Sequence, residues 1–96
     1  FQLGVVYQTP VEKLKKIPGI IKEVIDSVDM VRFGRAHFKS FGDFALIYEV
    51  VYYVLDRDYD LYMDVQQEIN LKIAERFEKE GIEFAYPTQT IFLEKS

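Results

Sequence analysis

The spacing of apolar residues changes along the chain, and each change predicts a different element of secondary structure. Alternate apolar positions at the start predict a first strand, at Phe1, Leu3, Val5 and Tyr7. Steps of three and four then predict a helix whose buried stripe is Leu14, Ile17, Ile21, Val24 and Val28. A second helical stripe follows at Tyr62, Val65, Ile69, Ile73 and Phe77. Strand-like patterns over residues 30–41, 44–55 and 82–93 complete the chain.

Local signals predict where the two helices begin, bend and end. The run TPVE at residues 9–12 has the form of a capping box with proline at the first helical position, so the first helix is expected to start there. Pro18 removes a backbone donor inside this helix and predicts a kink or two short helices. Gly81 is well placed as the C-cap of the second helix.

The sequence patterns of the strands also predict where each strand lies in the sheet. In the second strand the apolar parity changes across Gly34-Arg35, which predicts a β-bulge there. The segment 44–55 is apolar on both faces, as in a central strand covered on both sides. The last segment is broken at Tyr86-Pro87, and proline is tolerated at sheet edges and bends.

The predicted order is therefore strand-helix-strand-strand-helix-strand. This is the α+β, ferredoxin-like βαββαβ arrangement, in which an antiparallel sheet carries both helices on one face. The first and third strands are then central, and the second and fourth lie at the edges. We expect one domain over residues 1–96, with a ferredoxin-like body at 1–86 and a C-terminal strand at 87–96 after the Tyr-Pro bend.

Composition narrows the function classes. The net charge of −4 and the pI near 4.9 argue against a nucleic-acid partner, which requires a basic face. Arg32, Arg35 and Lys39 form the one local basic cluster, interpreted as a solvated strand face. The absence of cysteine excludes disulfides and thiolate metal sites, and no apolar run approaches the ~20 residues of a membrane span. The chain opens at Phe1 without an initiator methionine, so a fragment of a larger protein is expected.

Candidate chemistry is sparse, and no catalytic, metal-binding or cofactor-binding residue is predicted. His37 is the single histidine and lacks the partner that general-base or metal chemistry needs. The run DRDYD at residues 56–60 resembles the start of a calcium loop, but Leu61 and Gln67 occupy positions where glycine and glutamate are required. A helix cap at Asp58 or Asp60 explains the acids better. Because this fold hosts many functions, a ligand-sensing or dimerising regulatory domain remains an alternative.

Three stretches together resemble a known family. They are LGVVYQTP at residues 3–10, GDFALIYEV at 42–50 and FEKEGIEFAYPTQTIFL at 77–93. In order and spacing they are similar to the C-terminal cytosolic domain of the small-conductance mechanosensitive channel (MscS) family. The resemblance implies the last part of a homo-heptameric channel of the cell membrane, with membrane-spanning helices and a middle β domain preceding it. It also implies a cytoplasmic vestibule with side portals for ions and small solutes.

The resemblance assigns a role to the end of the chain. In the family, one strand from each subunit follows the Tyr-Pro bend and joins a small parallel barrel. This implies a bend at Tyr86 and Pro87 and an assembly strand made of Thr88, Gln89, Thr90, Ile91, Phe92 and Leu93. Ala85, where many members carry proline, and the bulky Phe92 depart from the pattern. A strand after a proline bend has unpaired backbone groups suited to another subunit, but from the residues alone an edge strand completing its own sheet is an equal alternative.

Overall fold

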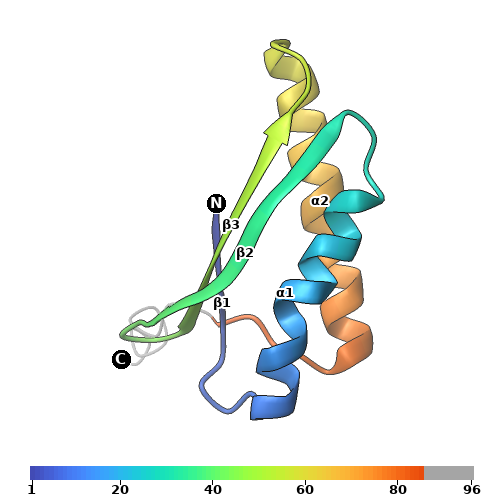
Figure 1. The fold of residues 1–96 in the computed structure, drawn as a ribbon. Helices are drawn as coiled ribbons and strands as arrows, with labels where there is room; N and C mark the ends of the chain where they lie inside the picture. The colour runs from blue at the N-terminus through green and yellow to red at the C-terminus, as the bar shows by residue number, and fades with distance from the viewer. Residues whose placement is uncertain (86–96) are drawn as a thin grey trace, which may run out of the picture.

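The computed structural model describes residues 1–85, and its elements follow the predicted order. The strands are β1 (Gln2–Val5), β2 (Val31–Phe41) and β3 (Leu46–Val54), and the helices are α1 (Val11–Asp26) and α2 (Tyr59–Glu80). The strands form an antiparallel sheet in the order β1-β3-β2. Both helices lie on the same side of this sheet (Figure 1). The α+β, ferredoxin-like class is confirmed.

A short segment after α2 takes the place expected for the fourth strand. Phe84 forms an isolated antiparallel bridge with Val5 of β1. The main-chain N–H of Ala85 donates to the carbonyl of Gly4 over 2.9 Å, on the outer edge of β1. This pairing leaves β1 and β3 central, as the topology requires. The predicted strand over residues 82–93 is represented only by this bridge, because residues 86–96 lie outside the described part.

The core lies between the sheet and the two helices, and the predicted helical stripes supply half of its buried residues. Val28, just after α1, extends the α1 stripe into the core, and Leu14 is partly buried. The predicted place of Tyr62 in the buried stripe of α2 is wrong, because its side chain is exposed at the start of the helix. The fully buried side chains of largest volume are Tyr48, Phe77, Ile17, Ile21, Ile25, Ile69, Val5 and Val50. Burial of these apolar surfaces is the main stabilising contribution to the fold.

Two irregularities bend β2 along its pairing with β3. The first lies between Phe33 and Arg35, which confirms the predicted bulge. Gly34 is required there, since a Cβ on it would lie 2.7 Å from the carbonyl oxygen of Val51. The second irregularity, between Phe38 and Ser40, was not predicted. A bulged, twisted edge is a poor template for unwanted strand pairing.

The start and middle of α1 differ from expectation. The predicted capping box is wrong: the cap position is Pro10 without a side-chain bond, and the Thr9 hydroxyl donates to the carbonyl of Val6 over 2.7 Å. The two short helices are also wrong, because α1 runs without interruption through Pro18. Proline at position 18 deprives the Leu14 carbonyl of its helical donor. The hydroxyl of Tyr48 donates to that carbonyl over 2.8 Å instead, which satisfies the acceptor.

β3 is central, but only one of its faces is covered in the described residues. Leu46, Tyr48 and Val50 point into the core and are buried. On the opposite face Val51 is partly exposed and Tyr53 is exposed. The expectation of a strand covered on both sides is therefore corrected for residues 1–85. The bare face still carries apolar side chains, which is why the sequence pattern looked like that of a strand buried on two sides.

Candidate functional site

The residues predicted for assembly lie outside the part of the chain that the structure describes. These are the bend residues Tyr86 and Pro87 and the strand residues Thr88, Gln89, Thr90, Ile91, Phe92 and Leu93. What the structure does show is the segment that leads into them, from the end of α2 to Ala85. We call this segment, residues 81–85, the exit segment.

The exit segment begins at a tight helix end. Gly81 has a φ of 71° in the left-handed region, which confirms its predicted role as the C-cap of α2. The N–H of Ile82 donates to the carbonyl of Phe77 over 2.9 Å, so the last turn of the helix is closed by main-chain bonds. The ammonium of Lys13 donates to the Gly81 carbonyl over 3.2 Å, which ties the turn to the start of α1.

Phe84 then fastens the exit segment to both layers of the fold. Its ring stacks on that of the buried Phe77, with centroids 4.9 Å apart and planes inclined by 19°. Its main chain pairs with β1 at Val5. Aromatic contact and strand pairing together hold the position from which residues 86–96 continue. The base of the predicted assembly strand is thus anchored to α2 and to the sheet.

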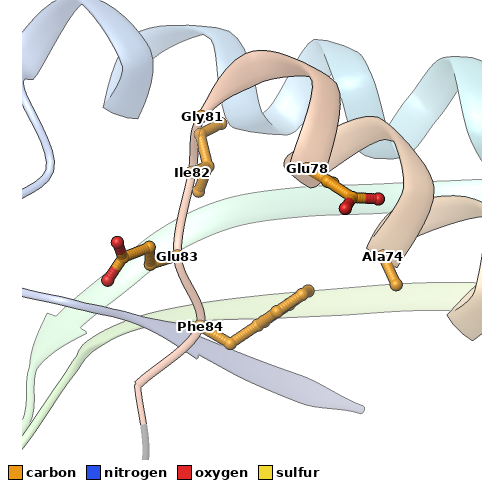
Figure 2. Close-up of a pocket in the computed structure, with 6 residues that line it drawn as sticks. All are labelled: Ala74, Glu78, Gly81, Ile82, Glu83 and Phe84. Atoms are coloured by element: carbon orange, nitrogen blue, oxygen red, sulfur yellow. The ribbon is translucent and has the colours of Figure 1, made fainter.

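A cavity of about 490 Å³ borders this segment. Its lining consists of Ala74, Glu78, Gly81, Ile82, Glu83 and Phe84. Figure 2 shows the carboxylates of Glu78 and Glu83 extending in opposite directions, with the Phe84 ring reaching toward Ala74. A small-molecule site generally needs polar groups that converge on the ligand. This cavity therefore offers no support for the alternative of a ligand sensor.

The hairpin between β2 and β3 lies at the same end of the molecule as the exit segment. Val5 pairs with both Phe84 and Leu46, and Leu46 pairs in turn with Phe41, so these residues form one row across the sheet. Phe41 is 75% exposed and Phe44 in the turn is 53% exposed. Apolar rings are therefore open to a partner at the end from which the C-terminal segment leaves.

The uncovered side of the sheet is mainly basic. The Arg35 guanidinium lies 3.1 Å from the Glu49 carboxylate, and the Lys39 ammonium lies 4.0 Å from the same group. Arg32 sits over the ring of Tyr53, 4.5 Å from its centroid. The predicted basic cluster is thus exposed on a strand face, as expected, and two of its three cations share a single carboxylate. We call this surface the basic sheet face.

The remaining candidate residues have structural explanations. His37 is exposed on β2, and residues 1–85 contain no group of three or more possible ligands arranged around a metal site. Asp58 is the N-cap of α2, with its carboxylate accepting from the N–H of Asp60 over 2.9 Å. This confirms the capping interpretation of the acidic run. Neither helix in the described part of the chain combines the length and apolar character of a bilayer-crossing helix.

Sequence reasoning missed one buried contact, between Tyr48 and Leu14. A signal was present, since Pro18 creates an unpaired carbonyl four residues earlier. The pattern could not say which side chain supplies the donor, because Tyr48 is 34 residues away in sequence. The exposed rings of Phe41 and Phe44 were missed for a similar reason. An alternating apolar residue has the same pattern whether its side chain meets the core or the solvent.

Comparison with known proteins identifies the family. Residues 1–84 match the family model described as mechanosensitive ion channel MscS, C-terminal. The small-conductance mechanosensitive channel MscMJ of Methanocaldococcus jannaschii is 46% identical over 95 residues, which cover 97% of this chain and 27% of that protein. The large-conductance channel MscMJLR of the same organism is 42% identical over 98 residues, and an MscS family protein of Aquifex aeolicus is 36% identical over 98 residues. The chain spans about a quarter of the length of these relatives. It belongs to the MscS family of mechanosensitive ion channels and corresponds to their C-terminal domain.

Proposed function

We propose that this domain holds channel subunits together on the cytoplasmic side of the cell membrane and shapes the vestibule that ions cross before the pore. In this proposal the complete channel is a homo-heptamer, and residues 87–96 form the strand that each subunit contributes to a parallel barrel. The domain has no catalytic role. Conduction itself belongs to a membrane-spanning part of the subunit.

The observation that carries the proposal is the family match together with its extent. The similarity to MscMJ covers 97% of this chain, which leaves about three of 96 residues unmatched. Residues 86–96 number eleven, so the similarity extends into the predicted assembly strand. Because the similarity to channel subunits includes the C-terminal residues, it supports the same role for these residues in a channel.

The anchored exit segment supports the assembly role on physical grounds. A strand that joins subunits must transmit load to its own domain without peeling away from it. Phe84 meets this need, because its ring stacks on Phe77 of α2 while its main chain pairs with β1. Load on the C-terminal segment would therefore pass into both layers of the core.

The test compares the mass of the complete subunit in detergent with that of a form ending at Tyr86, by multi-angle light scattering. We expect a closed ring for the complete subunit and smaller or mixed species for the shortened one. A full-length variant with Ile91→Asp and Leu93→Asp should behave like the truncation, since charges on this side of an assembled strand are costly to bury. Thr90→Ser serves as the matched control and should leave the ring intact.

Channel activity is measured in parallel by patch recording under membrane tension. We expect currents from the complete subunit and altered or lost currents from the truncated form. If the truncated subunit keeps both its ring mass and its tension-activated currents, the assembly role of residues 87–96 is refuted. If the complete subunit forms rings but passes no current under tension, the proposed role in a mechanosensitive channel fails.

A further inference from the structure

We infer that neighbouring subunits contact each other through two different surfaces of this domain, the basic sheet face of one copy and the β3–α2 end of the next. The inference rests on the proposed function, because it names the partner in the assembly. The β3–α2 end comprises residues 55–64, at the end of the molecule opposite the hairpin (Figure 1). We call it the acidic end.

The basic sheet face combines positive charge with exposed apolar side chains, as an interface to an anionic surface would. It faces away from both helices, and no element of residues 1–85 covers it (Figure 1). Arg32, Arg35 and Lys39 give it three positive charges, against one negative charge from Glu49. Val51 and Tyr53 add apolar surface between the charges. Such a mixture of cations and apolar side chains suits an anionic protein surface with exposed rings.

The acidic end has the complementary character. Residues 56–64 carry Asp56, Asp58, Asp60 and Asp64 against Arg57 alone, a net charge of −3. Tyr59 is 70% exposed and Met63 46% exposed, so apolar side chains stand among the acids. Like the basic sheet face, this end combines charge with exposed apolar area, but the sign of its charge is reversed.

Three acids on the helices, away from this end, already have cationic partners. Glu23 pairs with Arg76 at 2.9 Å, and the carboxylates of Asp26 and Glu68 pair with lysines one helical turn away on their own helices. Within residues 1–85, no ion pair involves the four aspartates of the acidic end. With four such aspartates in residues 56–64, this end carries a dense negative charge that can neutralise the basic sheet face of another copy.

The two surfaces differ, so the contact is heterologous. Face-to-face or end-to-end pairing of identical surfaces would bring like charges together, which is unfavourable. When the basic sheet face of one copy pairs with the acidic end of another, the first copy keeps a free acidic end and the second keeps a free basic sheet face. Repetition of that contact closes into a ring when the rotation per subunit permits it. This geometry fits the cyclic assembly proposed above without requiring any two-fold contact.

The test is cysteine cross-linking in the complete subunit, in a cysteine-free background. His37→Cys lies on the basic sheet face and Met63→Cys on the acidic end, and both side chains are exposed. With a flexible bismaleimide, the double variant should give a ladder of covalent oligomers up to the ring. Each single variant should remain monomeric on a denaturing gel. Co-assembly of the two single variants should give dimers and nothing larger.

Charge reversal tests the electrostatic part of the contact. Lys39→Glu or Asp64→Lys in the double-cysteine background should each lower the cross-linked yield severalfold, and the two reversals together should recover it. Lys16→Glu on the exposed side of α1 makes the same charge change as Lys39→Glu away from both surfaces and should have no effect. Raising salt from about 0.1 M to about 1 M shortens the screening length from about 10 Å to about 3 Å and should also lower the yield.

The outcomes separate this inference from the proposed function. Thr90→Cys serves as an independent reporter of the assembly strand. If Thr90→Cys cross-links and light scattering gives a ring, but His37→Cys/Met63→Cys does not cross-link, the face-to-end contact is wrong and the assembly role stands. If His37→Cys alone forms dimers, the contact joins identical faces and the inference is overturned. If neither pair cross-links and the mass is that of a monomer, the proposed function itself fails.

Discussion

The hydroxyl of Tyr48 donates a hydrogen bond to the main-chain carbonyl of Leu14 over 2.8 Å, from the sheet into the middle of α1. That carbonyl would normally accept from the N–H of residue 18, which is proline here. A side chain of β3 thus replaces the missing helical bond, and α1 continues through Pro18. Tyr48 is fully buried, so the contact is also a polar link between the sheet and α1 inside the core.

Tyr48→Phe should lower the free energy of unfolding by about 1–3 kcal/mol, because it leaves a buried carbonyl without a donor. In a Pro18→Ala background residue 18 supplies its own N–H to Leu14, and the same substitution should cost clearly less. Urea unfolding of the wild type, the two single variants and the double variant, followed by circular dichroism, measures the coupling between residues 18 and 48.

Tyr52→Phe is the matched control for that cycle. The Tyr52 hydroxyl donates to the side-chain amide of Gln66 over 2.7 Å, and Gln66 is partly exposed, so water can replace the lost donor. The cost of Tyr52→Phe should be smaller and independent of residue 18. Equal costs of Tyr48→Phe with and without Pro18→Ala would show that the Tyr48 hydroxyl does not replace the missing helical donor.

Stability should fall at high pH because of the same tyrosine. Burial raises the pKa of Tyr48 to about 12, whereas the pKa of the phenol in the unfolded chain stays near its ordinary value of 10.0. The folded state therefore holds this proton more tightly, and its contribution is fully present below about pH 10 and is lost as the pH approaches 12. The stability difference between the wild type and Tyr48→Phe should shrink between about pH 10 and pH 12 in urea unfolding. A constant difference across that range would contradict the assignment.

Two glycine substitutions should have opposite effects. Gly81→Ala places a Cβ on a residue with a φ of 71°, which costs about 1–2 kcal/mol in the left-handed region. Gly19→Ala lies inside α1, where a Cβ would meet nothing within 4 Å, and should stabilise the chain by about 0.5–1 kcal/mol. Thermal unfolding of both variants checks the signs. A stabilising Gly81→Ala would mean that the end of α2 does not need its left-handed cap.

The cap of α2 gives a prediction about the acidic end. Asp58→Ala should lower stability by about 0.5–2 kcal/mol, since the N–H of Asp60 loses its acceptor. Asp58→Asn keeps an acceptor oxygen and should cost less. Asp64→Ala, an exposed change without a cap bond, is the control and should lie within about 0.5 kcal/mol of the wild type. Equal losses for Asp58→Ala and Asp58→Asn would show that charge near the helix start, and not the capping bond, stabilises α2.

Much of the fold could be predicted because its signals are local. The helical stripes predicted both helices, the parity change across Gly34-Arg35 predicted the first bulge of β2, and Gly81 predicted the end of α2. Each signal arises within a few residues, from side-chain periodicity or from backbone sterics that hold in any context. The candidate assembly residues 86–93 came from the family resemblance and remain a prediction, since they lie outside the described part of the chain.

The sequence by itself determined the order of the elements, many of the residues that face the core, and the family. Only the tertiary structure decided how Pro18 is accommodated, because its compensating donor comes from Tyr48, far away along the chain. The structure also decided that the second face of β3 is uncovered in residues 1–85. Apolar alternation says that a face avoids water without saying what covers it, and that partner is fixed by three-dimensional packing.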